Sequence, residues 1–242
     1  MKKATLFVFA LLCTTLGMAQ QYQMHVKLNN GTVVDYDVAD VESVTWSEKT
    51  TGDANFHEGR ELVDLGLSVK WATCNVGANS PEEYGDYFAW GETEPKGVYG
   101  LSNYFDTLDY GATFVKYNND GGKVALDSED DVVHLKWGGD WRMPTAAEQY
   151  ELHFNCTWTW VSKNGVNGYI VTGPNGNSIF LPAAGGYYDS IFYGAGTYGS
   201  YWSCSLVDSY SDGACYLYFD SCNVYVSSGS RCFGLSVRAV CP

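Results

Sequence analysis

The sequence predicts an α+β protein that is mostly β, with an antiparallel sheet, long loops and one or two short helices. The chain has 27 Gly, 19 Tyr and 8 Trp but only 6 Pro, a composition typical of a loop-rich β protein. Short segments of alternating apolar and polar residues recur between turns that contain Gly and Asn. A strong helix-start signal is found at one place, Thr145–Glu148.

Residues 1–19 are predicted to be a secretory signal peptide. Lys2 and Lys3 precede an apolar run over residues 6–12, and the small-residue site Gly17–Ala19 follows. A secreted, periplasmic or outer cell surface location is therefore expected. No other apolar stretch approaches the length of a membrane span, so no membrane insertion is expected.

The charge of the chain argues against a nucleic-acid partner. The formal net charge is -14, and it becomes -16 once Lys2 and Lys3 are removed with the leader. A surface of this charge repels nucleic acid and anionic lipid.

Residues 20–47 are expected to form a small β-hairpin or meander. Alternating segments flank the turn Asn29–Gly31, which is a strong hairpin signal, and residues 41–46 add a third strand. Residues 48–60 are polar and poor in apolar side chains, which indicates a linker.

Residues 61–242 are expected to form the main domain, whose first strands are predicted at residues 62–65, 69–73 and 87–90. The chain from residue 92 to 139 is long, acidic and irregular, as in functional loops or insertions. Within it, Asp127–Asp131 lacks the Gly and the distal Glu of an EF-hand loop. A solvated acidic turn is therefore expected there in place of a calcium site.

One helix is predicted over residues 146–154, because Thr145 and Glu148 form a capping box after Pro144. Strands are expected after it at residues 157–161, 169–172 and 178–181, with turns at residues 164–165, 167–168 and 174–177.

Residues 186–240 have the composition of a recognition surface. In an extended strand over residues 214–220, the side chains of Cys215, Leu217 and Phe219 share one face, and those of Tyr216, Tyr218 and Asp220 share the other. The first face suits a core. The second combines rigid tyrosines with small polar neighbours, as antibody-like binding sites do. The alternative is that tyrosines are frequent here because they favour β-strands.

Further along the stretch, Val224 and Val226 are expected to point inward and Tyr225 and Ser227 outward. Residues 235–240 alternate again and predict a closing strand, with Leu235 and Val237 inward.

The 8 Cys include Cys13 in the leader, so an odd number, 7, remains in the mature chain. An odd number means that at least one thiol is unpaired or forms a bond between chains. Cys74 and Cys156 lie in well-patterned segments and are the candidate disulfide pair, with two buried thiols as the alternative.

No motif indicates catalysis. The four histidines occur singly, no Cys spacing suits a metal, and there is no nucleophile elbow, phosphate-binding loop or dinucleotide fingerprint. The sequence therefore predicts a protein that is not an enzyme and that binds no metal or cofactor.

Six motifs together resemble the Fibrobacter succinogenes major paralogous domain of secreted bacterial proteins: Trp71–Gly77, Pro81–Glu92, Trp141–Thr145, Leu181–Gly185, Tyr201–Ser203 and Gly234–Arg238. They occur in order, and the match spans about residues 61–240. The resemblance implies a C-type-lectin-like fold, in which a twisted antiparallel sheet carries few helices and long loops.

Members of this family resemble the target proteins of diversity-generating retroelements, in which asparagine codons of a C-terminal variable region are rewritten. The rewritten codons do not specify Lys, Glu, Gln, Trp or Met, and none of these occurs between Ser203 and Pro242. Lys and Glu are already absent for a long way upstream of that segment. The resemblance implies a scaffold of Trp202, Leu217, Phe219, Val224, Val226 and Val237. It implies that the variable, ligand-binding positions are Tyr188, Asp189, Leu206, Val207, Asp208, Tyr210, Asp212, Tyr216, Tyr218, Asp220, Tyr225, Ser228, Cys232 and Phe233.

The leading functional hypothesis is a secreted or surface-displayed, non-catalytic protein that recognises a macromolecular partner through a variable C-terminal face. The partner is expected to be a protein or glycan ligand at a cell surface. The alternative is a glycan-binding or polysaccharide-associated module of fixed specificity.

Overall fold

The computed structural model describes residues 23–27, 33–38, 56–108, 113–120, 122–208 and 210–242. The chain divides into two compact units, residues 1–51 and 52–242. In the first unit, β1 (Gln23–Lys27) and β2 (Val33–Asp37) pair antiparallel, with Val26 opposite Val34. The predicted leader, the turn Asn29–Gly31, the third strand at residues 41–46 and residues 48–55 of the linker lie outside the described residues.

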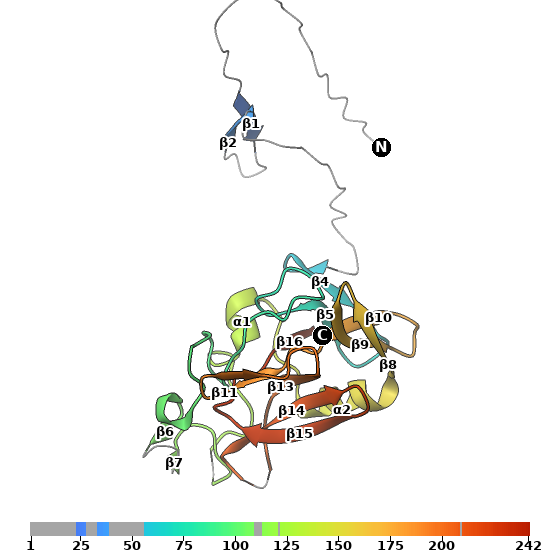
Figure 1. Cartoon of the computed structure of the whole chain (residues 1–242). Helices are drawn as coiled ribbons and strands as arrows, with labels where there is room; N and C mark the ends of the chain where they lie inside the picture. Colours follow the sequence, from blue (N-terminus) through green and yellow to red (C-terminus); the bar gives the residue numbers. More distant parts are fainter. Residues whose placement is uncertain (1–22, 28–32, 39–55, 109–112, 121, 209) are drawn as a thin grey trace, which may run out of the picture. The chain divides into compact units, whose positions relative to one another are not determined.

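The second unit, the main domain, is mostly β, with several antiparallel sheets and two α-helices among its described residues (Figure 1). This confirms the predicted α+β, mostly β class. None of the helices in the described part of the chain is long and apolar enough to cross a membrane.

A four-stranded sheet joins the beginning of the main domain to the end of the chain. Its order is β16 (Arg238–Cys241), β5 (Lys70–Asn75), β4 (Arg60–Val63) and β3 (Phe56–His57). Ordered structure thus begins before residue 61, at residues that composition assigned to the linker 48–60. The His57 carbonyl accepts a hydrogen bond from Trp141 Nε1 at 3.0 Å, which ties β3 to the core.

A second sheet contains β8 (Thr157–Lys163), β9 (Val166–Thr172) and β10 (Ser178–Pro182). Asn164 and Gly165 both have positive φ, 50° and 83°, as the tight turn between twisted antiparallel strands requires. The turn predicted at residues 167–168 is absent, because β9 runs through it. A Cβ at Gly168 would lie 2.3 Å from the Leu181 carbonyl oxygen, so glycine permits close strand approach there.

The third sheet, β13 (Tyr198–Leu206), β14 (Gly213–Asp220) and β15 (Val224–Ser230), carries most of the predicted recognition stretch. Helix α2 (Ala146–Asn155) packs against it (Figure 1). The capping box that predicted this helix is present, since the Thr145 hydroxyl accepts from Glu148 N and the Glu148 carboxylate accepts from Thr145 N.

Smaller elements fill the long connections. They are β6 (Thr107–Leu108), β7 (Thr113–Phe114), β11 (Gly186–Tyr188), β12 (Ile191–Tyr193), a 3-10 helix at Leu101–Asn103 and α1 (Val132–Trp137). Helix α1 lies in the segment expected to be irregular. It starts at the end of the acidic run, where the buried Asp131 carboxylate accepts from Val133 N and His134 N as the N-cap.

The rest of the acidic run pairs with lysines. Lys116 Nζ lies 3.1 Å from Asp127 and 2.7 Å from Asp130, and Lys123 also bonds to Asp127. These ion pairs stabilise a folded turn.

The core of the main domain has two large clusters. The first surrounds Trp90, Trp141 and Trp202. The second lies between β8–β10, α2 and the inner face of the third sheet, and contains Leu152, Leu217, Phe219 and Val240. Both clusters contribute to a single compact unit.

The C-terminal segment is buried on both sides. Residues 234–241 are all buried, so Leu235 and Val237 point inward as predicted and the residues between and after them are buried as well. Strand β16 starts only at Arg238. The Arg238 guanidinium donates to Asn75 Oδ1 and to the carbonyls of Ala72, Thr73 and Phe180. Each nitrogen of this buried group therefore donates a hydrogen bond.

Candidate binding surface

The third sheet has one core face and one face turned away from α2. Leu217 and Phe219 are 1% and 0% exposed and pack in the second core cluster, as their alternation predicts. Val224 and Val226 pack against the same cluster, whereas Tyr225 is 46% exposed. The face that carries Tyr216, Tyr218 and Tyr225 is therefore the outer face of the sheet.

Three tyrosines from three strands are in contact on this outer face. Tyr218 lies opposite Tyr225 in the β14–β15 register, and their ring centroids are 5.0 Å apart. Tyr198 of β13 stacks on Tyr218 at 5.7 Å with an interplanar angle of 27°. Cross-strand aromatic pairs of this kind hold the rings in place without a covalent link.

A second group of rings adjoins the first. Tyr188 of β11 contacts Phe233 at 4.3 Å and Tyr193 of β12 at 5.9 Å. Phe233 and Tyr216 both border Gly229, because a Cβ there would lie 3.4 Å from Phe233 Cε2 and 3.0 Å from Tyr216 Cε1. We call the two groups together the aromatic surface; its members are Tyr188, Tyr193, Tyr198, Tyr216, Tyr218, Tyr225 and Phe233.

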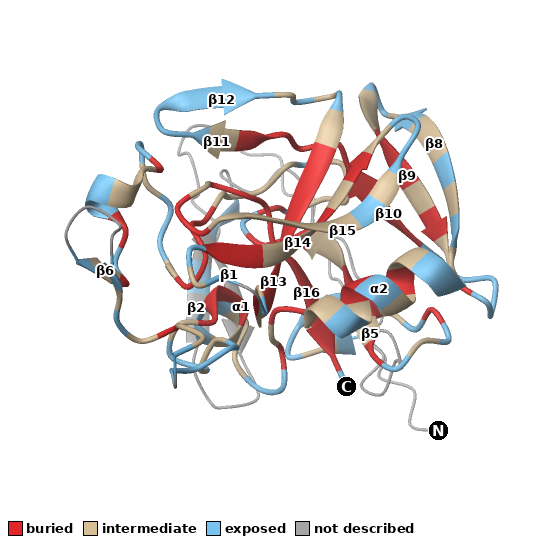
Figure 2. Cartoon of the chain, turned by 90° about the horizontal axis from the view of Figure 1, so that it is seen from below, coloured by how far each residue is buried: buried red, intermediate tan, exposed pale blue. Residues whose placement is uncertain are grey.

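The β11–β12 hairpin forms one side of the aromatic surface. Strand β12 is exposed along its whole length (Figure 2), with Ile191, Phe192 and Tyr193 at 51%, 40% and 47%. Phe192 nonetheless stacks on its hairpin partner Tyr187, with ring centroids 4.8 Å apart, and packs edge-on against Tyr87 at 5.4 Å, and the contact with Tyr87 holds the hairpin against the domain. The exposed side chains of β12 thus belong to a hairpin that is packed against the domain.

Two members of the aromatic surface, Tyr193 and Tyr198, were not among the predicted site residues. Tyr198 could not have been found from alternation, because it shares a strand face with Trp202, which the sequence placed in the scaffold. Tyr193 carries no signal either, since its position depends on the pairing of β11 with β12.

Tyr216 is anchored more deeply than its neighbours. Its ring packs edge-on against Trp202 at 5.6 Å, and Trp202 Nε1 donates to the Phe88 carbonyl. Burial raises the pKa of Tyr216 and of Tyr218, and it raises the pKa of Tyr198 to about 12. These hydroxyls therefore stay protonated at neutral pH and are available as hydrogen-bond donors and acceptors.

The loop between β13 and β14 carries four predicted site residues, Val207, Asp208, Tyr210 and Asp212. The Tyr210 hydroxyl lies 2.8 Å from Ser228 Oγ. Ser228 pairs with Cys215, which places it on the side of the sheet opposite to Tyr216 and Tyr218. The predicted site is therefore divided between the aromatic surface and the edge formed by this loop.

Two predicted site residues are not available for binding. Leu206 is 3% exposed and belongs to the first core cluster, where its N–H donates to the Val124 carbonyl. Cys232 is 5% exposed and packs with Tyr99 and Tyr104. The prediction that these two positions contact a ligand is wrong, because long-range partners cover them.

The two acidic residues closest to the aromatic surface have backbone roles as well. Asp220 Oδ1 accepts from Cys222 N at 2.8 Å and from Asn223 N at 2.9 Å, and these bonds hold its pKa below the usual range. Asp189 has φ 57° and its carbonyl accepts from Tyr99 N. The carboxylate of Asp189 is exposed at the turn between β11 and β12.

The candidate disulfide is not formed in the structure. Cys74 and Cys156 are both free and both partly exposed. Cys74 faces a pocket beside α1, whereas Cys156 ends α2 and packs against the second core cluster. The sequence pattern placed both residues in regular elements, but it carried no information on their proximity.

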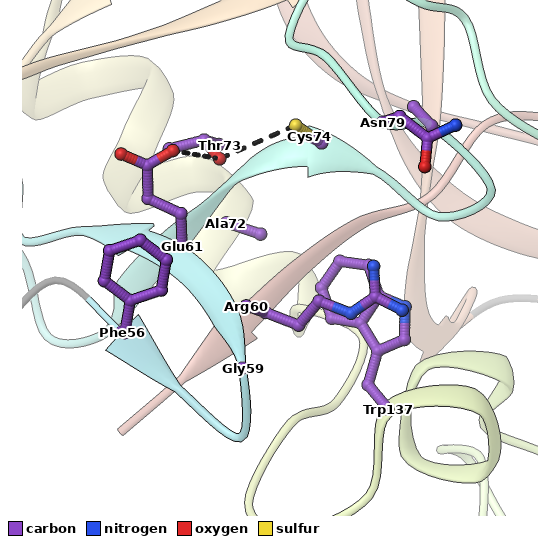
Figure 3. Close-up of a pocket in the computed structure, with 10 residues that line it drawn as sticks. Phe56, Gly59, Arg60, Glu61, Ala72, Thr73, Cys74, Asn79 and Trp137 are labelled. Carbon is purple, nitrogen blue, oxygen red and sulfur yellow. Dashed lines mark hydrogen bonds between the residues drawn. The ribbon is translucent and has the colours of Figure 1, made fainter. Parts of the chain in front are cut away.

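A pocket of about 220 Å³ lies away from the aromatic surface, between β3, β4, β5 and the end of α1. The Arg60 guanidinium lies over the Trp137 ring at 4.9 Å, and Glu61 accepts a hydrogen bond from Thr73 (Figure 3). Arg60 and Glu61 both line the pocket.

The described residues contain no group of three or more His, Cys, Asp or Glu that could hold a metal ion. The buried Cys204 thiol borders a second cavity with Asp131 and His134. Burial raises the pKa of Cys204 to about 11, so this thiol is poorly ionised and weakly nucleophilic at neutral pH.

The chain was also compared with known proteins. No protein-family model, no curated protein and no solved structure matched it.

Proposed function

We propose that this chain is a secreted or surface-displayed binding protein that recognises a macromolecular ligand through the aromatic surface and performs no catalysis. The observation that supports this proposal best is the grouping of seven rings from three strands, a hairpin and the segment that follows β15. Large exposed aromatic patches on a soluble domain usually mark interaction sites. Tyrosine supplies contact area and hydrogen bonding at a low cost in side-chain entropy.

The arrangement of the core supports the same proposal. The inner face of the third sheet is fixed by Leu217 and Phe219, and Trp202, on the neighbouring strand, packs edge-on against Tyr216. A rigid scaffold of this kind tolerates changes of outer side chains without loss of the fold. Such tolerance is what a variable protein of a retroelement requires. We therefore keep the resemblance to the paralogous domain, the variable region and the C-type-lectin-like fold as parts of the proposal.

A glycan-binding module of fixed specificity is the second candidate. The rings of Tyr198 and Tyr218 are stacked side by side on the surface and their hydroxyls stay protonated, so the surface combines apolar area with polar groups. Sugars, like proteins, present both kinds of group to such a surface.

The experiment compares Tyr225→Ala with Tyr150→Ala. Both side chains are exposed tyrosines, 46% and 45%, but Tyr150 lies on α2, away from the aromatic surface. Purified variants are used for pull-down from cell surfaces and for binding to glycan arrays. A ligand retained by wild type and by Tyr150→Ala but lost by Tyr225→Ala supports the proposal. Equal retention by both variants, and by a Tyr218→Ala, Tyr225→Ala double variant, contradicts it.

A further inference from the structure

The segment that carries the aromatic surface has an unusual charge distribution. Residues 164–230 contain four Asp and no Lys, Arg or His. The cation next in the sequence, Arg231, is fully buried and paired with Asp106. Within the described residues, no basic side chain of this segment can therefore neutralise its carboxylates.

Two of the four carboxylates, Asp189 and Asp220, lie beside the rings, and the other two lie in the loop at the edge of the sheet. Asp189 follows Tyr188 directly, and Asp220 accepts a hydrogen bond from Tyr218 at 3.5 Å. Asp208 and Asp212 are exposed in the loop before β14. The Asp212 carbonyl accepts from Arg231 N at 3.2 Å, so the loop is attached to the chain two residues before Phe233, at the edge of the sheet.

We infer that the partner of the aromatic surface is a basic polypeptide segment, rich in Arg or Lys. This inference rests on the proposed binding function and names the class of its ligand. A guanidinium group can lie over a tyrosine ring and donate to a neighbouring carboxylate at the same time. Residues 164–230 supply no cation of their own that would compete for these rings and carboxylates.

The magnitudes require several such contacts together. An exposed cation–π contact contributes about 0.5–1 kcal/mol, and an exposed ion pair about 0–1 kcal/mol. One contact of either kind gives no useful affinity, whereas a segment with several cations engages several rings and carboxylates. The net charge of -14 also favours encounter with a cationic partner at low salt.

A neutral glycan would use the rings and donate hydroxyl groups to the carboxylates, but it would gain no charge attraction from them. An anionic glycan or an anionic lipid surface would be repelled by them and by the net charge of the domain. The charge distribution therefore favours the basic polypeptide over the other classes of ligand.

The test uses a labelled oligo-arginine peptide as the probe, with a glycine–serine peptide of equal length as the neutral comparison. A local triple variant carries Asp189→Asn, Asp208→Asn and Asp212→Asn, and leaves Asp220 in its turn. Asn is suited to the positive φ of Asp189. A control triple variant carries Asp37→Asn, Glu58→Gln and Asp140→Asn, three other exposed carboxylates, and has the same net charge.

We expect the local triple variant to bind the oligo-arginine peptide about tenfold more weakly than wild type, and the control triple variant to change binding less than about twofold. Tyr225→Ala is expected to weaken binding, and added salt is expected to reduce it. Equal losses of peptide affinity in the two triple variants would assign the effect to the electrostatic field of the whole protein and would overturn the inference.

Failure of the inference can be distinguished from failure of the proposed function. Tyr225-dependent binding of a neutral glycan, without binding of the oligo-arginine peptide, overturns the basic partner but leaves the aromatic surface as the binding site. If the Tyr218→Ala, Tyr225→Ala double variant binds the oligo-arginine peptide or the neutral glycan as well as wild type does, both the basic partner and the aromatic surface as binding site are overturned.

Discussion

Arg231 Nη2 lies 2.7 Å from Asp106 Oδ2, and both side chains are buried almost completely. The Asp106 carboxylate also accepts from the backbone N–H groups of Lys116 and Tyr117 at 2.6 Å and 3.0 Å. The Arg231 guanidinium lies 4.0 Å from the centroid of the Phe114 ring. One ion pair thus attaches the long acidic connection to the C-terminal segment, two residues before Phe233.

Asp106→Asn should destabilise the domain strongly, because it leaves the buried Arg231 guanidinium without its charged partner. Breaking a buried ion pair from one side costs about 3–5 kcal/mol, a large part of the stability of an ordinary domain. Urea unfolding would measure the change. Lys123→Met removes the more exposed pair with Asp127 and should change stability by less than about 1 kcal/mol. Similar losses in the two variants would mean that the buried pair is not a major stabilising contact.

The two faces of β14 should respond differently to truncation. Leu217→Ala removes a fully buried side chain and should cost about 2–5 kcal/mol of stability, with little direct effect on a ligand. Tyr218→Ala should weaken ligand binding and change stability much less, because its ring is only partly buried on the outer face. Thermal unfolding and binding titrations with the same samples would separate the two effects.

Tyr216→Ala should show both effects, unlike the expectation from strand alternation alone. The sequence placed Tyr216 and Tyr218 on the same solvent-facing side, but the ring of Tyr216 packs against Trp202 and the first core cluster. We therefore expect a lower melting temperature for Tyr216→Ala than for Tyr218→Ala. Equal melting temperatures would show that the contact with Trp202 contributes nothing measurable.

The Arg142–Glu148 pair should make stability dependent on pH in the acidic range. Burial alone would raise the pKa of Glu148, but hydrogen bonds from Arg142 and from Thr145 N outweigh it and hold this pKa below its usual value. A lowered folded-state pKa contributes stability above the unfolded value of about 4.3, and this contribution is lost as the pH falls through the folded pKa.

Glu148→Gln should therefore be less stable than wild type near neutral pH, and the difference should shrink as the pH falls below about 4. Glu94→Gln is the control, because its carboxylate is 78% exposed in its pair with Lys136. Unfolding free energies measured across this pH range would decide the point. A difference between wild type and Glu148→Gln that stayed constant down to the lowest pH would exclude the proposed linkage.

Local signals in the sequence predicted the elements that depend on local chemistry. The capping box at Thr145–Glu148 gave the position of α2, and Asn164–Gly165 gave the β8–β9 turn. Helix α1 has only six residues and starts from an aspartate within an acidic run, so composition indicated a turn there. Its helical form depends on the buried Asp131 carboxylate, which also accepts from Met143 N, a contact between distant residues.

The same distinction applies to the binding surface. Alternation correctly separated Leu217 and Phe219 from Tyr218 and Tyr225, because one face of the sheet is covered throughout and the other is covered only around Trp202 and Ser200. Alternation could not place Leu206, which is covered by the first core cluster. It also could not reveal the β11–β12 hairpin, whose contact with Phe233 joins segments far apart in the chain.

The seven cysteines of the main domain should react with an alkylating reagent in an order set by exposure. Cys222 is exposed, and Cys204, Cys232 and Cys241 are buried. Burial also raises the pKa of Cys204 and of Cys156 to about 11 in each case, which lowers the thiolate fraction. Peptide mapping after brief alkylation without reduction should find Cys222 labelled first. Protection of both Cys74 and Cys156 until a reductant is added would instead show a disulfide between them.

The gene sequence tests whether the aromatic surface is diversified. If a retroelement rewrites this region, the DNA should resemble a nearby template repeat, should differ from it almost only where the template has adenine, and should lie close to a reverse transcriptase gene. The structure restricts which codons can differ, because buried side chains cannot change volume without loss of stability.

We therefore expect differences at exposed or half-buried positions of the recognition stretch, such as Tyr188, Asp212, Tyr218 and Tyr225. We expect none at Trp202, Leu217, Phe219 and Val237, which are buried. Leu206 and Cys232 should also be constant, although the family resemblance placed them among the variable positions, because the core covers both. A locus with neither repeat nor reverse transcriptase would remove the diversified form of the proposal and leave a binding protein of fixed specificity. A repeat whose differences fell equally on buried and exposed codons would contradict the assignment of the outer face.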